Sequence, residues 1–178
     1  MGHRRVDGLA LAREHEGPAC FTAKKRRPRG SKGAGVKFEK EFAKKVGSAG
    51  VHGQWFEFHD RNGKGYAQTD VLLFTHEATF VVECKLGNIL AGQLQILELY
   101  KPILEFVYRR PAYGIVLARH LTENPSPELT VGSLHDAMRL ARSGEIAVLQ
   151  WRERFPLILP PGLDPSLRYP PAKAQRAS

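Results

Sequence analysis

One short run, Phe80–Leu86 with the sequence Phe-Val-Val-Glu-Cys-Lys-Leu, limits the folds open to this chain more than any other feature. It is apolar enough to form a buried strand, and side chains along a strand alternate between its two faces. One face is then entirely apolar and consists of Phe80, Val82, Cys84 and Leu86. The other face places the Glu83 carboxylate beside the Lys85 ammonium on an otherwise apolar strand.

The segments around this run alternate between helical and strand patterns. The patterns predict helices over 36–46, 89–108 and 131–143, and strands over 54–59, 66–75, 79–86, 112–118 and 146–151. Asn62-Gly63 lies between the first two strands and favours a hairpin turn. Pro102 lies inside the long helix and predicts a kink or break. A hairpin-rich start followed by crossover helices predicts an α/β fold with a mixed central sheet flanked by helices.

The 178 residues are enough for one compact domain with a tail at each end. The net charge is +9, and residues 1–35 carry +6 of it, with nine Lys or Arg and three Asp or Glu. We therefore predict a flexible basic arm over 1–34, a domain over 35–155 and a Pro-rich tail over 156–178. A basic arm attracts nucleic acid, although a solvated terminus without a partner has the same composition. The residues expected to bind nucleic acid are Lys24, Lys25, Arg26, Arg27, Arg29 and Lys32.

The composition argues against several other classes of protein. No run approaches the ~18 apolar residues of a membrane span, and the first residues lack the apolar stretch of a signal peptide. A cytoplasmic protein with no membrane partner is therefore expected. Neither the number nor the spacing of the cysteines, Cys20 and Cys84, suggests a zinc cluster or a disulfide framework. The sequence contains no Gly-x-x-x-x-Gly-Lys-Ser/Thr phosphate loop and no Gly-x-Ser-x-Gly elbow.

Asp70 precedes Glu83 by 13 residues and lies near the middle of the predicted strand 66–75. If this strand forms a hairpin with 79–86, the two carboxylates can lie next to each other. Close carboxylates repel unless a cation neutralises them. Two oxygen ligands, open positions and no His or Cys cluster suit Mg²⁺ or Mn²⁺ better than zinc.

A third carboxylate is expected from the first helix. The apolar stripe predicted there contains Val36, Ala43 and Val46, with Glu39 among them. An unpaired charge in such a stripe is costly, which favours a functional role for Glu39. Glu41 points away with the neighbouring lysines, as a solvated residue would. We therefore place Glu39 rather than Glu41 in the site. This preference depends on which face of the helix is buried.

Glu39, Asp70 and the Glu83-Cys84-Lys85 triplet together resemble the PD-(D/E)XK nuclease superfamily, with spacing similar to its Holliday-junction resolvase and nuclease-related branches. The resemblance implies the restriction-endonuclease-like αβββαβ core. It implies catalytic roles for Glu39, Asp70, Glu83 and Lys85, and a Mg²⁺ or Mn²⁺ ion held by Asp70, Glu83 and the Cys84 carbonyl. It also leaves a homodimer open, because many members dimerise.

The resemblance covers roughly residues 35–120, and the sequence departs from it at one point. Some members carry Gln-x-x-x-Tyr on the helix after the Lys strand. Here Gln93 and Gln95 precede Tyr100 at other spacings. Gln93 shares a helical face with Tyr100, which makes it the candidate accessory residue.

The expected function is metal-dependent hydrolysis of phosphodiester bonds, with DNA favoured over RNA and endonuclease action favoured. Two other functions stay open: a nucleic-acid-binding module that keeps the fold without catalysis, and a subunit of a recombination or transposition complex that is active only with partners. The non-functional alternative is an ordinary Glu83–Lys85 pair on the solvent face of an edge strand. Agreement between the helix acid, the strand acid and Glu-x-Lys favours a functional site.

Overall fold

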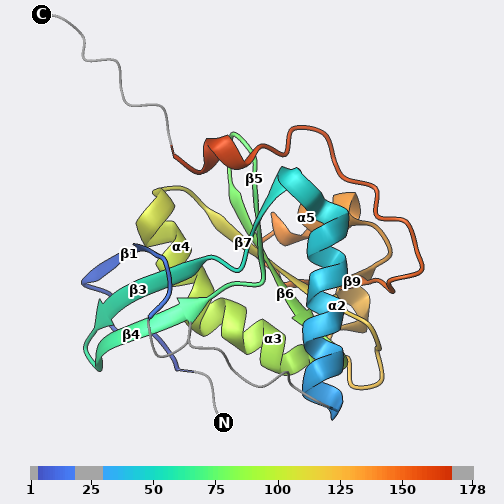
Figure 1. Ribbon diagram of the computed structural model, residues 1–178, viewed down its shortest axis with the longest axis horizontal. Helices are drawn as coiled ribbons and strands as arrows, with labels where there is room; N and C mark the ends of the chain where they lie inside the picture. The colour runs from blue at the N-terminus through green and yellow to red at the C-terminus, as the bar shows by residue number, and fades with distance from the viewer. Residues whose placement is uncertain (1–3, 19–29, 170–178) are drawn as a thin grey trace, which may run out of the picture.

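The most apolar runs of the chain form the middle of a six-stranded sheet in the computed structural model, which describes residues 4–18 and 30–169. The strand order is β2-β5-β6-β7-β9-β8 (Figure 1). The strands are β2 (Gly50–His52), β5 (Val71–Phe74), β6 (Thr79–Lys85), β7 (Ala112–Ala118), β9 (Ala147–Gln150) and β8 (Thr130–Val131). β2, β5 and β6 pair antiparallel, whereas β6, β7, β9 and β8 pair in parallel. The predicted α/β class with a mixed central sheet is therefore confirmed.

A smaller antiparallel sheet, in the order β1-β3-β4, lies on the opposite side of the molecule from α2 (Figure 1). Its strands are β1 (Leu11–His15), β3 (Trp55–Asp60) and β4 (Gly63–Gln68). The helices are α2 (Gly30–Val46), α3 (Ile89–Gln95), α4 (Lys101–Tyr108) and α5 (Leu134–Ala141). Short helical turns are η1 (Gly47–Ala49), η2 (Ile96–Tyr100), η3 (Pro127–Leu129) and η4 (Pro165–Arg168).

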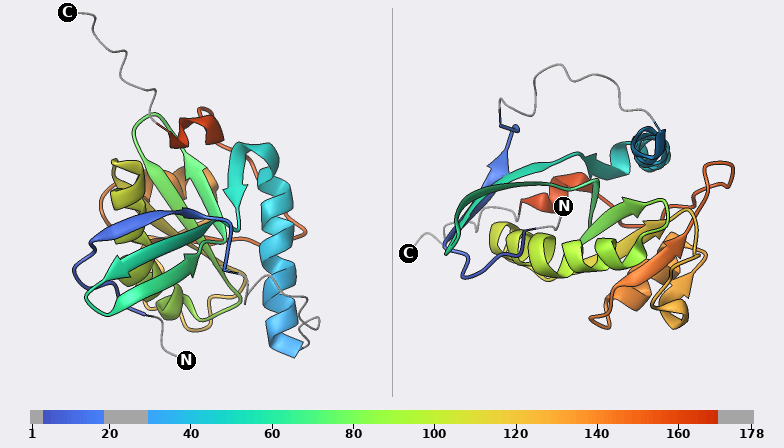
Figure 2. Two further views of the ribbon diagram at one scale, coloured as in Figure 1. Left: turned by 60° about the vertical axis from the view of Figure 1, so that its left-hand side comes forward. Right: turned by 90° about the horizontal axis from the view of Figure 1, so that it is seen from below.

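Alternation along the strands divides the core in two, with one part on each face of the six-stranded sheet. Phe80 and Val82 of β6 lie in the same apolar cluster as the buried residues of α2 and α5. Val81 lies in the other cluster, with α3, η2, α4 and the three-stranded sheet. Figure 2 shows α3 and α4 running along the side of the sheet that faces away from α2. The predicted two faces of β6 are thus confirmed.

The predicted single strand 66–75 is wrong, because the chain bends and joins two different sheets. β4 pairs with β3, whereas β5 pairs with β2 and β6. At the bend, Thr69 N–H donates to the Gln54 carbonyl and Gly53 N–H donates to the Asp70 carbonyl, each at 3.0 Å. Gly53 has a left-handed φ of 61°, a conformation that suits glycine. It lets the segment before β3 change direction together with the segment after β4, to which it is hydrogen-bonded. Asp70 therefore lies between two strands and not in the middle of one.

The domain bounds also differ from those predicted. Residues 11–15 of the predicted flexible arm form β1, which pairs with β3, and α2 begins at Gly30 rather than 36. Residues 156–169 pack on the domain, and the half-buried side chains that do so are Leu157, Leu159, Leu163 and Leu167. Asp164 N–H also donates to the Phe74 carbonyl at 3.1 Å. Among the described residues, no helix has the length and apolar character needed to cross a bilayer.

Candidate functional site

Asp70 reaches from the bend to the neighbouring strand β6. β5 pairs with β6 up to Val82, so the backbone of β6 beyond that residue is open on this side. Asp70 Oδ2 accepts a hydrogen bond from the Cys84 backbone N–H at 2.7 Å. The N–H and C=O of one strand residue point to the same side, so the Cys84 carbonyl also faces Asp70. The bend thus brings a carboxylate and a backbone carbonyl to one place.

Glu83 lies beside them and is only 3% exposed. Lys85 Nζ donates to Glu83 Oε1 at 2.6 Å. Glu83 Oε2 is buried and has no hydrogen-bond partner within the described part of the chain. A buried carboxylate oxygen without a donor is costly. A donor or a cation at Glu83 Oε2 would therefore stabilise the folded protein.

α2 directs Glu39 toward the same place. The residues of α2 that are buried against the sheet are Phe38, Phe42 and Val46. The stripe predicted through Val36 and Ala43 is therefore rotated relative to the observed one, and Glu39 lies half-buried at its edge. Burial and the nearby Asp70 carboxylate raise the pKa of Glu39 to about 7.

Burial and the Asp70 carboxylate disfavour the ionisation of Glu39 and Glu83. Burial, followed by the charge of Asp70, raises the pKa of Glu83 to about 8. Burial also raises the pKa of Asp70. The Lys85 ammonium acts in the opposite direction at all three carboxyls but does not offset these causes. At neutral pH the single ammonium of Lys85 is therefore not enough to keep all three carboxyls ionised.

The donor atoms fit a hard divalent cation better than zinc. Among residues 4–18 and 30–169, no group of three or more His, Cys, Asp or Glu side chains is placed to hold a metal ion. Mg²⁺ does not need three such side chains, because it binds one or two carboxylates and keeps several waters. A cation between Asp70 and Glu83 would relieve their repulsion and contact the unpartnered Glu83 Oε2. Asp70 and Glu83 are thus the residues that would hold Mg²⁺ or Mn²⁺, with Glu39 beside them.

The raised pKa values predict a metal-free protein that loses stability as pH rises. Glu39 and Glu83 have ordinary pKa values of 4.5 and folded values of about 7 and 8. The folded state therefore binds their protons more tightly, so their stabilising contribution is complete below the ordinary value and is lost as pH rises through the folded values. Thermal melts in EDTA should show a falling melting temperature between about pH 5 and pH 8.

Glu83→Gln should flatten this pH dependence, because the amide does not titrate. Carboxyls with lowered pKa, such as Asp60 and Asp136, change stability only at lower pH, so they do not contribute to the slope between about pH 5 and pH 8. Mg²⁺ or Mn²⁺ should raise the melting temperature of the wild type near pH 8 by mass action. An equal slope in the wild type and in Glu83→Gln would contradict the assigned cause.

Lys85 is held by a chain of hydrogen bonds that the sequence did not predict. Lys85 Nζ donates to Gln95 Oε1 at 3.1 Å, and Gln95 Nε2 contacts the Tyr100 hydroxyl. Tyr100 in turn donates to the Gln68 carbonyl at 2.6 Å. Gln95 and Tyr100 are five residues apart, a spacing that aligns in a π-helix, and η2 is a π-helix.

Pro102 gives a physical reason for the wide turn. Proline has no N–H to donate, and its ring clashes with the carbonyl four residues earlier in an α-helix. That carbonyl belongs to Glu98, and it accepts a hydrogen bond from Val6 N–H at 2.8 Å instead. The predicted irregularity near Pro102 is therefore a π-helical turn between α3 and α4.

The predicted accessory residue Gln93 faces elsewhere. Its Nε2 donates to Ser126 Oγ at 3.1 Å. Gln95, and not Gln93, contacts Lys85, so the predicted accessory residue is wrong by two positions. The spacing from Gln95 to Tyr100, together with Pro102 just beyond, was the signal in the sequence for this arrangement.

Tyr100→Phe should destabilise the protein by roughly 1–3 kcal/mol, because it leaves the Gln68 carbonyl and the Gln95 amide without this partner. Urea unfolding of the two proteins measures the difference. Tyr113→Phe is the matched control, since its hydroxyl has no hydrogen bond among the described residues and its ring packs on Phe80. Equal effects of the two substitutions would show that the Tyr100 hydroxyl holds nothing in place.

The basic arm residues fall mostly outside the structure. Lys32 is exposed near the start of α2. The other predicted nucleic-acid-binding residues lie outside the described residues, and they are Lys24, Lys25, Arg26, Arg27 and Arg29.

Comparison of the chain with protein-family models, with curated proteins and with solved structures finds no match. A function must therefore be inferred from the chemistry of the side chains themselves.

Proposed function

We propose that the protein is a metal-dependent nuclease with a PD-(D/E)XK-type site, which hydrolyses phosphodiester bonds in nucleic acid and in DNA first. The observation that carries this proposal is the meeting of acids from three separate elements. Glu39 comes from α2, Asp70 from the bend after β4, and Glu83 from β6, next to Lys85.

Burial separates this cluster from an ordinary surface ion pair. β6 lies between β5 and β7 and is not an edge strand. Glu83 is 3% exposed, and the side chain of Lys85 is 23% exposed. Burying several acids beside one ammonium destabilises the metal-free fold, so a role in binding a cation explains it better than a role in stability.

The side chains of the cluster have complementary tasks. Held by Asp70 and Glu83, a divalent ion would lower the pKa of a bound water and offset charge on a phosphate. Lys85 has three N–H donors and gives two of them to Glu83 and Gln95. The third can be directed to the attacking water or to a phosphate oxygen. Glu39, with a pKa of about 7, can accept a proton at neutral pH.

Cleavage of labelled single-stranded, duplex and branched DNA tests the proposal. Activity should require Mg²⁺ or Mn²⁺ and disappear in EDTA. Lys85→Met should lower the rate by roughly 100-fold or more, since it removes the donor at the reacting group. Lys45→Met, on an exposed position of α2, is the control with the same loss of charge and should cleave normally.

Two results would contradict the proposal. Cleavage that persists in EDTA, or that is equal in Lys85→Met and the wild type, would place the activity outside this cluster. Tight, salt-sensitive binding without cleavage would instead support a module that binds nucleic acid and has no catalytic role.

A further inference from the structure

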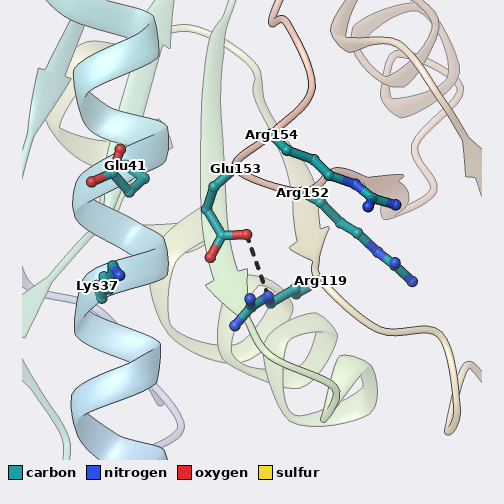
Figure 3. A pocket seen from close by; sticks show the side chains of 6 residues that line it. All are labelled: Lys37, Glu41, Arg119, Arg152, Glu153 and Arg154. Carbon is teal, nitrogen blue, oxygen red and sulfur yellow. Dashed lines mark ion pairs between the residues drawn. The ribbon is translucent and has the colours of Figure 1, made fainter.

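A basic pocket lies at the carboxyl ends of β7 and β9, beside α2, and has no part in the chemistry described above. Its volume is about 470 Å³, and its lining residues are Lys37, Glu41, Arg119, Arg152, Glu153 and Arg154. Four cationic side chains and two carboxylates line it, so the pocket carries an excess of two positive charges. In Figure 3, Lys37 and Glu41 come from α2, Arg119 from the end of β7, and the others from the chain after β9.

The sheet places the backbone at this pocket beside that of Lys85, whose side chain points to the other face of the sheet, toward Gln95 of α3. Lys85 is in register with Ala118, and Arg119 N–H donates to the Lys85 carbonyl at 3.1 Å. Trp151 N–H likewise donates to the Ala118 carbonyl at 3.1 Å, so Arg152 follows on the next strand. Neighbouring strands lie about 4.8 Å apart. The backbone of Arg119 is thus about one strand spacing from β6, and that of Arg152 about two, on the order of 10 Å. Carboxyl ends of parallel strands are the usual place for ligands in α/β sheets.

Part of the positive charge in the pocket is not neutralised by a neighbour. Arg119 pairs with Glu153 at 3.3 Å, as the dashed line in Figure 3 marks. Within the described residues, Lys37 and Arg152 make no ion pair. The guanidinium groups of Arg152 and Arg154 extend away from α2 in Figure 3, so the positive charge is spread along the chain after β9. Such a track suits a chain of phosphates better than one small anion.

A second cavity, lined from β1 and the segment before β3, has the wrong charge for this role. It has a volume of about 480 Å³ and includes Glu14, Glu16 and Arg168 among its lining residues. Its acidic side chains outnumber its single arginine, so a polyanion would be attracted less strongly there.

We propose that the pocket lined by Lys37, Arg119 and Arg152 binds backbone phosphates of the nucleic-acid strand that passes through the carboxylate cluster. The inference rests on the proposed nuclease function for its ligand, and it adds the path of the strand, from Lys85 across the ends of β7 and β9. Contacts of this kind fix the position of a strand without reading its sequence.

Binding of a fluorescein-labelled DNA duplex to the full chain in EDTA tests this path without depending on cleavage. The double variant Lys37→Gln/Arg152→Gln should bind about tenfold more weakly than the wild type, with the slope of log affinity against log salt reduced by about 2. Lys44→Gln/Arg142→Gln is the control with the same charge change, on exposed positions outside the pocket. It should change the affinity less than about twofold.

Substrate variants then test for a direct contact. One phosphate at a time is replaced by an uncharged methylphosphonate. Wild type should lose affinity at one or two adjacent positions, and the pocket variant should be insensitive at those same positions, as coupled partners are. The control variant should keep the wild-type pattern.

Equal weakening by the pocket and control variants, or the same methylphosphonate pattern in all three proteins, would overturn the inference. Either result leaves the nuclease proposal intact if Lys85→Met still lowers the cleavage rate by roughly 100-fold or more. The absence of any binding by the wild type at low salt would overturn the inference and also count against nucleic acid as the substrate.

Discussion

Asp70→Asn should lower metal-dependent cleavage by at least about 1,000-fold, because it removes one of the two carboxylates assigned to the cation. The amide oxygen can still accept the hydrogen bond from Cys84 N–H, so the bend between β4 and β5 should keep its shape. The substitution also removes a negative charge from a repelling cluster, so the melting temperature in EDTA should not fall. Initial rates of DNA cleavage and thermal melts measure the two effects.

Glu77→Gln is the control for this experiment. Glu77 precedes the same strand β6, but its side chain is exposed and its charge pairs with Arg142 at 3.8 Å. The Glu77→Gln variant should cleave like the wild type, since exposed ion pairs of this kind contribute little to stability. Equal rates for Asp70→Asn and Glu77→Gln would show that the Asp70 carboxylate holds no catalytic ion.

Phe42→Ala should destabilise the protein by about 3–5 kcal/mol, the usual cost of removing a fully buried aromatic ring. Phe42 is fully buried on α2 and packs edge-on against Trp151, with ring centroids 5.6 Å apart. The same helix carries Glu39, so loosening its contact with the sheet should also lower cleavage. Urea unfolding gives the stability change, and the cleavage rate is measured well below the unfolding transition.

Phe155→Ala provides the comparison, because this ring is 47% exposed and lies on the chain after β9. Its loss should cost less than about 1 kcal/mol, as surface substitutions usually do. A similar cost for Phe42→Ala would mean that α2 is not anchored through this side chain.

The sequence predicted the elements whose pattern is local and strong. Ala112–Ala118 is an unbroken apolar run and forms β7 between two other strands, as expected for a strand buried on both faces. Alternation along β6 placed Glu83 and Lys85 on one side of the sheet, where the structure has them. Two-residue periodicity is thus enough to put these functional groups together.

Elements that depend on distant partners were missed. β1 has a mostly polar sequence, and its position follows from pairing with β3, from the Arg13–Glu57 ion pair at 2.9 Å and from Tyr108, which donates to Glu14 at 2.6 Å. The bend at Asp70 was not predicted, because the apolar run Val71–Phe74 follows it directly and reads as a continuation of the same strand. The pairing of Gln95 with Tyr100 was not predicted, because residues five apart do not align on an α-helix with 3.6 residues per turn. They do align in a π-helix, which η2 forms.

Calorimetric titration of the metal-free protein with Mn²⁺ at about pH 8 tests the central claim most directly, because the Asp70 and Glu83 carboxyls are the proposed ligands. Wild type should show saturable binding with release of protons, since the raised pKa values leave part of the cluster protonated. Asp70→Asn and Glu83→Gln should each lose this binding, whereas Glu77→Gln should keep it. Unchanged Mn²⁺ binding in Asp70→Asn and Glu83→Gln, or none in the wild type, would contradict a metal centre at this position.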